Sequence, residues 1–102
     1  MPGRRINFDK INRAALPQLP DILSRWLPDG ERRGKEWCAL NPTRPDRRRG
    51  SFNVNMETGK WGDFATGNHG RDVISLSAYL FKTSQGQAAH DVARMLAVDP
   101  YV

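Results

Sequence analysis

Residues 36–76 read EWCALNPTRPDRRRGSFNVNMETGKWGDFATGNHGRDVISL, and this stretch decides the fold. Within it, residues 51–55 alternate apolar and polar side chains, as a half-buried β-strand does. Residues 56–59 suit a hairpin loop, because Gly59 tolerates the positive φ angle that closes such a turn. The sequence therefore predicts a hairpin of residues 51–55 and 60–65, with residues 36–40 as a third strand.

Helices are predicted on both sides of these strands. Asn7 suits the N-cap of a first helix, and Pro20 fits the first turn of a second helix. Beyond the strands, Asp72 can begin a third helix, and Ser84 with Gln87 forms a capping box for a fourth. The predicted fold class is α+β, a small three-stranded antiparallel sheet flanked by N-terminal helices and two C-terminal helices.

Length, composition and cysteine count limit the class of protein. A chain of 102 residues with 38% hydrophobic residues can bury one modest core, so we expect a single domain over residues 1–102, with residues 1–6 as a flexible tail. No apolar run reaches the roughly 20 residues of a membrane span, and no secretory signal is present. Cys38 is the only cysteine and cannot form an internal disulfide. We therefore expect a cytoplasmic protein without a membrane partner.

The positive charge is confined to one part of the chain. Between Arg32 and Lys60 lie eight basic and three acidic residues, so this window accounts for the whole net charge of +5. Outside the window, basic and acidic residues balance. A charge excess in one segment creates a local field, for which a polyanion is the usual partner, although a solvated loop would carry the same composition.

Catalytic and metal sites find little support in the sequence. His69 and His90 have no nucleophile motif near them, and a nuclease using both histidines is a remote alternative. A closed zinc site requires about four cysteine or histidine ligands, whereas the chain has one cysteine and two histidines at unsuitable spacing. We expect no catalytic residue, no metal and no other cofactor.

The sequence holds more of the residues needed to bind a single nucleic-acid strand. Such binding needs cations for the phosphates and aromatic faces on which bases stack, and arginine suits phosphate because its planar fork donates two hydrogen bonds. We expect Phe52, Phe64 and Trp26 in the core. The predicted nucleic-acid contacts are Arg32, Arg33, Lys35, Trp37, Arg44, Arg47, Arg48, Arg49, Asn53, Asn55, Lys60 and Trp61.

Five short motifs follow one another in this region: CALNP (38–42), GSFNV (50–54), TGKW (58–61), DFATG (63–67) and GRDVI (70–74). Together they resemble the N-terminal zinc-ribbon domain of DNA primases. The likeness is greatest to the degenerate versions at the head of phage, plasmid and prophage primase-helicases. In that family the domain recognises single-stranded template, and the polymerising site lies in a separate downstream domain. The resemblance implies a zinc-ribbon-like sheet.

The resemblance does not imply a zinc site in this chain. Cys38 stands at the first ligand position and Asn41 at the histidine, while Asp63 and Thr66 stand at the two cysteines of the knuckle. With three of four ligands replaced, we expect packing and hydrogen bonds to hold the sheet.

The expected function is a non-catalytic DNA-binding module of a phage- or plasmid-type primase, not an enzyme by itself. Its partner would be single-stranded DNA or RNA, with a helicase or the downstream primase domain as a further partner. The alternative is a small phage-borne protein-interaction module that docks on a replication or host defence protein. Whether the chain is an excised domain or a complete small protein stays open.

Overall fold

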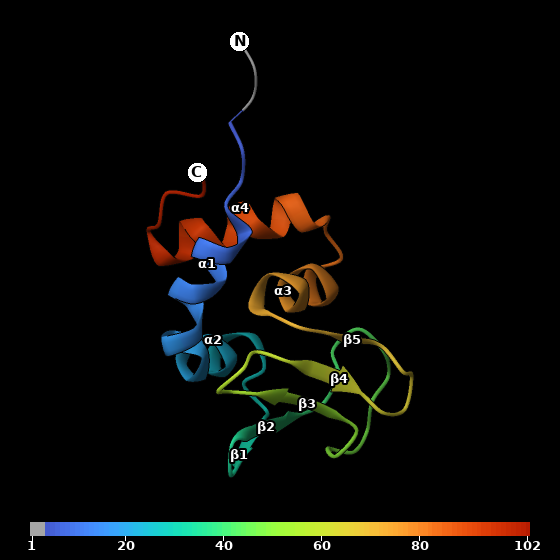
Figure 1. Ribbon diagram of the computed structural model, residues 1–102. Helices are drawn as coiled ribbons and strands as arrows, with labels where there is room; N and C mark the ends of the chain where they lie inside the picture. The colour runs from blue at the N-terminus through green and yellow to red at the C-terminus, as the bar shows by residue number, and fades with distance from the viewer. Residues whose placement is uncertain (1–3) are drawn as a thin grey trace.

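The computed structural model describes residues 4–102, and in it two helices precede an antiparallel sheet and two helices follow it (Figure 1). The α+β prediction is confirmed. The helices are α1 (Phe8–Ala15), the 3-10 turn η1 (Leu16–Gln18), α2 (Leu19–Trp26), α3 (Val73–Phe81) and α4 (Gln85–Leu96). The strands are β1 (Glu31–Arg33), β2 (Glu36–Ala39), β3 (Phe52–Asn55), β4 (Trp61–Asp63) and β5 (His69–Gly70).

The sheet has five strands in the order β1-β2-β3-β4-β5, where the sequence predicted three. The two additional strands are the edges. Arg32 of β1 pairs with Trp37, and His69 of β5 pairs with Gly62. Both edges form through backbone hydrogen bonds. The sequence predicted a charged connector and a glycine turn for these segments, because runs so short and polar show no side-chain alternation.

Alternation along the three central strands separates the two faces of the sheet. Val54 lies opposite both Trp37 and Trp61, and all three side chains are buried. On the other face, Asn53 lies opposite Cys38 and Gly62. One face therefore belongs to the core, and we call the other the outer face.

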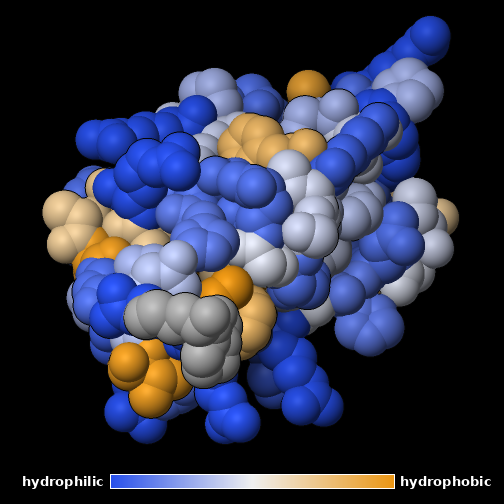
Figure 2. All heavy atoms as spheres, turned by 90° about the horizontal axis from the view of Figure 1, so that it is seen from above, coloured by the Kyte–Doolittle hydropathy of each residue, from blue (hydrophilic) through white to orange (hydrophobic). Residues whose placement is uncertain are grey.

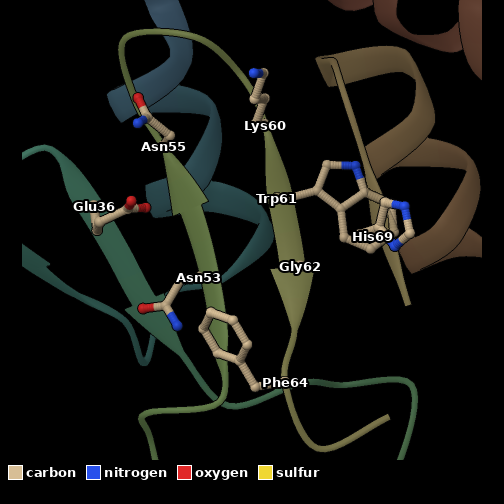
Figure 3. Close-up of a pocket in the computed structure, with 8 residues that line it drawn as sticks. All are labelled: Glu36, Asn53, Asn55, Lys60, Trp61, Gly62, Phe64 and His69. Carbon is tan, nitrogen blue, oxygen red and sulfur yellow. The ribbon is translucent and has the colours of Figure 1, made fainter. Parts of the chain in front are cut away.

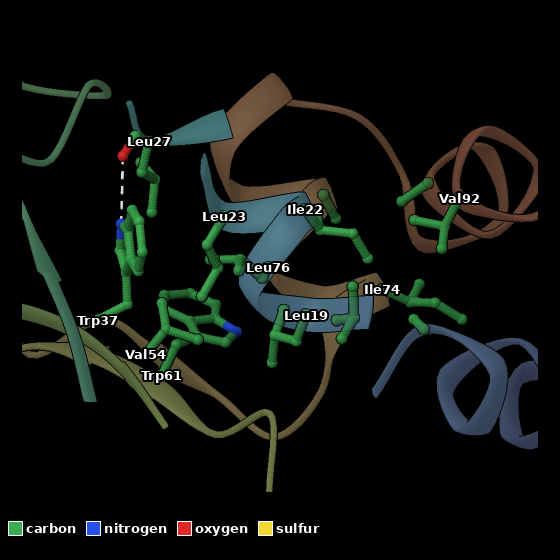
Figure 4. Close-up of a cluster of buried hydrophobic side chains, with 14 of the residues drawn as sticks. Leu19, Ile22, Leu23, Leu27, Trp37, Val54, Trp61, Ile74, Leu76 and Val92 are labelled. Atoms are coloured by element: carbon green, nitrogen blue, oxygen red, sulfur yellow. Dashed lines mark hydrogen bonds between the residues drawn. The ribbon is translucent and has the colours of Figure 1, made fainter. Parts of the chain in front are cut away.

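Helices α2 and α3 cover the inner face, and α1 and α4 lie farther from the sheet (Figure 1). Two indoles connect these layers, since Trp37 Nε1 donates to the carbonyl of Leu27 at 3.1 Å and Trp61 Nε1 to Ser75 Oγ at 3.0 Å. Figure 4 shows both rings among the aliphatic side chains of α2 and α3. Phe52 is fully buried, as predicted. The core therefore runs from the helices onto the sheet without a break.

The helix starts follow the predicted caps. Asn7 Oδ1 accepts from the amide of Lys10 at 3.0 Å, and Asp72 forms a capping box with Ser75 at the start of α3. Ser84 accepts from the amide of Gln87 at 3.0 Å. The reciprocal half of that predicted box is missing, because the Gln87 side chain donates to Asp91 instead.

Of the predicted tail, residues 1–3 lie outside the described part. Ile6 forms an antiparallel bridge with Tyr101, and the amide of Val102 donates to the carbonyl of Arg5. The two ends of the described chain are therefore paired with each other.

Seen from the helical end, the surface is mostly hydrophilic, and its apolar side chains form small separate groups (Figure 2). Across residues 4–102, no helix is both long enough and apolar enough to cross a membrane.

Candidate nucleic-acid interface

The outer face of the sheet carries a shallow hollow of about 360 Å³ (Figure 3). Its floor is Gly62, whose missing side chain leaves the middle of β4 bare. Asn55 and Lys60 stand at one end, and Phe64 and Asn53 at the other (Figure 3). The full lining is Glu36, Asn53, Asn55, Lys60, Trp61, Gly62, Phe64 and His69.

Phe64 is the main correction to the sequence prediction. We expected its ring in the core, yet it is 86% exposed and borders the hollow. The cause is strand alternation: Trp61 and Asp63 point inward, so Gly62 and Phe64 face outward. That alternation could have been read from the sequence, because a buried Trp61 places Phe64 on the opposite face. His69, another residue absent from the predicted site, borders the same hollow from β5 and is exposed.

The two tryptophans predicted to stack on bases lie in the core instead. Trp37 is 9% exposed and Trp61 is 7% exposed, and the indole N–H of each is bonded within the protein. Trp61 also packs on Tyr79 of α3, with 4.6 Å between the ring centroids. These rings have no free face for a base, although an edge of Trp61 reaches the hollow.

The two predicted asparagines line the hollow but are also engaged locally. Asn53 Nδ2 donates to the carbonyl of Gly50 at 3.0 Å, and its Oδ1 contacts Cys38 Sγ. Asn55 Oδ1 accepts from the amides of Glu57 and Thr58 in the hairpin loop. Their side chains fix the hairpin and the end of the loop formed by residues 44–49, and they present only their remaining polar atoms to the hollow.

The exposed cations among the predicted contacts divide into two groups. Arg32, Arg47, Arg48 and Lys60 are exposed, and within residues 4–102 none of them forms an ion pair. Surface ion pairs engage the other exposed cations: Arg33 with Glu31 at 2.7 Å, Lys35 with Glu57 at 3.2 Å and Arg49 with Glu31 at 3.7 Å. Exposed pairs of this kind contribute little stability and can be exchanged for phosphate.

The arginine loop, residues 44–49, reaches the edge of the hollow. Gly50, which ends the loop, is hydrogen-bonded to Asn53 on the rim. Two residues span at most about 7 Å, so Arg48 lies within side-chain reach of this rim. Lys60 and Phe64 therefore line the hollow, and Arg48 lies within reach of its rim. Arg32 lies opposite the inward-facing Trp37 in the strand register, so it belongs to the other face of the sheet.

Arg44 belongs to neither group, because it is used inside the protein. Its side chain is 25% exposed, and its Nε donates to the fully buried carboxylate of Asp63 at 2.9 Å. Burial alone raises the pKa of Asp63. Hydrogen bonds from Arg44, Asn41 and the Ala65 amide outweigh that effect and lower the pKa from 3.8 to about 2. Arg44 is therefore not available to a phosphate, contrary to the sequence prediction.

Among solved structures, the chain is similar to the primase of Aquifex aeolicus, in a structure comprising its zinc binding and RNA polymerase domains. The TM-score is 0.77 at 23% sequence identity, over 93% of this chain. This chain spans 22% of the length of that one. No protein-family model and no curated protein sequence matches the chain. The likeness shows that the chain has the fold of part of a primase.

Proposed function

We propose that this chain is a non-catalytic, single-stranded DNA-binding module of a primase, of the type found in phages and plasmids. The observation that carries the proposal is the surface shared by Phe64, Arg47 and Arg48. The amide of Phe64, whose ring is 86% exposed, donates at 2.9 Å to the carbonyl of Ser51, just after the loop that carries Arg47 and Arg48. Neither arginine forms an ion pair within residues 4–102. Single strands are held by this combination, with bases stacked on rings and phosphates on cations. The primase-like fold supports the same assignment.

The mode of binding differs from the one that the sequence predicts. Phe64 and His69 replace the two tryptophans as base-contacting rings, and Arg47 and Arg48 carry the phosphate contacts with Arg49 and Lys60 around them. Phosphate neutralisation releases counterions, so the affinity falls steeply as salt rises. RNA offers the same backbone charge, and competition between DNA and RNA oligonucleotides measures the preference.

The test is a fluorescence-anisotropy titration of a labelled single-stranded oligonucleotide against wild type and two triple variants. Reversing Arg47, Arg48 and Arg49 to glutamate abolishes binding without unfolding the domain. The matched control reverses three exposed arginines on the helices, Arg13, Arg25 and Arg94, and changes the net charge equally. If both variants lose the same affinity, the basic loop is not the binding surface.

A protein-interaction module is the second candidate, and one observation favours it. Phe81 at the end of α3 is 53% exposed and packs edge-on against Trp26, with 5.4 Å between the ring centroids. The partner would be a helicase, the downstream primase domain, another replication protein or a host defence protein. Absence of oligonucleotide binding at low salt, with tight binding to such a protein that Phe81→Glu abolishes, would favour this candidate over the first.

A further inference from the structure

A buried polar cluster joins four separate segments at the end of the sheet. Its centre is Asp63, whose Oδ2 accepts from Asn41 Nδ2 at 2.7 Å and from Arg44 Nε at 2.9 Å. The other oxygen, Oδ1, accepts from the Ala65 amide at 2.9 Å and from Arg44 Nη2 at 3.3 Å. Both carboxylate oxygens are therefore occupied by N–H donors.

The partners of Asp63 extend the cluster. Arg44 Nη2 also donates to Ser51 Oγ at 2.9 Å and lies 3.4 Å from the carboxylate of Asp46. Asn41 Nδ2 donates to the hydroxyl of Tyr79 on α3 at 2.8 Å. The cluster thus ties the arginine loop to the start of β3, the end of β4 and helix α3.

Two members of the cluster stand where the resemblance to primase zinc ribbons places metal ligands. The two members are Asn41 and Asp63. The resemblance also assigns ligand positions to Cys38 and Thr66, and the four side chains do not converge on a cation site. Cys38 Sγ contacts Asn53 Oδ1 instead, and Thr66 Oγ1 accepts from the amide of Asn68. Within the described part of the chain, no group of three histidine, cysteine or acidic side chains could hold a metal. The residues present therefore do not fit a tetrahedral zinc ion.

We infer that the Arg44 guanidinium takes over the cross-linking role of a metal, so that the domain folds without zinc and Arg44 positions the loop carrying Arg47 and Arg48. A guanidinium suits this role because it stays charged at every working pH and donates several hydrogen bonds in fixed directions. It also compensates a buried carboxylate, which would be strongly destabilising without a cation. Hydrogen bonding to Asp63 correspondingly raises the pKa of Arg44.

Zinc independence is tested on the purified chain by thermal unfolding with a strong chelator, with added zinc and with neither. The expected midpoints coincide, and metal analysis finds no stoichiometric zinc. A midpoint that falls on chelation, or a zinc-to-protein ratio of one that survives dialysis, would overturn the inference.

The role of Arg44 is tested by a double-mutant cycle. Arg44→Gln leaves Asp63 buried without a cation, so we expect a large fall in the urea midpoint, whereas the matched control Arg48→Gln leaves it unchanged. Combining Arg44→Gln with Asp63→Asn removes both charges and restores much of the lost midpoint, because no unpaired charge stays buried. The cycle is completed by the single variant Asp63→Asn. If the fall in stability of the double variant equals the sum of the falls in the two single variants, Arg44 and Asp63 are not coupled and the inference fails.

The positioning role has its own readout and rests on the proposed function. The double variant should fold but bind single-stranded oligonucleotide more weakly than wild type, with altered amide shifts over residues 43–50. Wild-type affinity in this variant would refute positioning by Arg44. If wild type itself binds no oligonucleotide, the proposed function fails, while the chelator and urea results still decide how the fold is held.

Discussion

A substitution at Phe64 can test the proposed base stacking without changing protein stability, because the ring is exposed and borders the hollow over Gly62. Removing an exposed ring costs the fold little, whereas loss of stacking weakens single-strand binding by about 1–3 kcal/mol per base. We predict that Phe64→Ala lowers oligonucleotide affinity on the order of 10- to 100-fold with an unchanged unfolding midpoint. Anisotropy titration and urea unfolding measure the two effects.

Phe8→Ala is the control for this variant, since Phe8 is a 42% exposed phenylalanine on α1, away from the sheet. It should leave the affinity unchanged, and Phe64→Trp should keep most of the binding. Equal affinities for Phe64→Ala and wild type would remove base stacking at this ring from the proposed mode.

Asp63 gives the protein a defined acid sensitivity. Its folded-state pKa of about 2 lies below the ordinary 3.8, so the folded state favours the ionised carboxylate. The resulting stability is present above pH 3.8 and is lost as the pH falls toward 2, because the unfolded chain then binds the proton first. We predict a loss of about 2 kcal/mol over this window, measured by urea unfolding at stepped pH. The double variant with Arg44→Gln and Asp63→Asn should lose this component, and an unchanged pH profile in that variant would assign the sensitivity to other carboxylates.

Among the elements, the central strands and the helices were predictable because their signals are local. Residues 51–55 alternate, Gly59 sits in the hairpin loop with φ +81°, and Asp72 caps α3 as expected. Strands β1 and β5 were missed because an edge forms wherever a neighbouring strand offers backbone groups, whatever its side chains. The polar cluster was missed for a related reason: Asn41 and Asp63 meet only once β2 and β4 have been placed in the sheet.

Two side chains cap the start of helix α3. Asp72 Oδ1 accepts from the amide of Ser75 at 2.8 Å, and Asn12 Oδ1 of α1 accepts from the preceding amide, that of Ile74, at 3.0 Å. We predict that Asp72→Ala lowers the free energy of unfolding by about 1 kcal/mol. The comparison is Asp21→Ala in the first turn of α2, whose carboxylate has no hydrogen bond within the described residues, and its effect in urea should be less than half as large. Equal losses would mean that the charge near each helix start, and not the capping bond, supplies the stability.

At the scale of the whole molecule, the charge and the core occupy different parts of the fold. The window that holds the entire +5 charge, residues 32–60, covers most of β1, all of β2 and β3 and the arginine loop, while the charges outside the window balance. The core runs between these parts through Trp37 and Trp61. The domain can therefore present a strongly basic surface without placing like charges around the helices that stabilise it.

A continuous core predicts that helices and sheet unfold together. Leu23 of α2 is fully buried in the same cluster as Trp37 and Trp61 of the sheet. We predict that Leu23→Ala costs about 2–5 kcal/mol and moves the far-ultraviolet circular dichroism transition and the tryptophan fluorescence transition to the same lower urea concentration. The circular dichroism reports mainly the helices, and the fluorescence includes both buried indoles of the sheet. If the two transitions separate, the helices and the sheet are independent units. The polar cluster around Asp63 and Arg44 would then have to hold the sheet without support from the helical core.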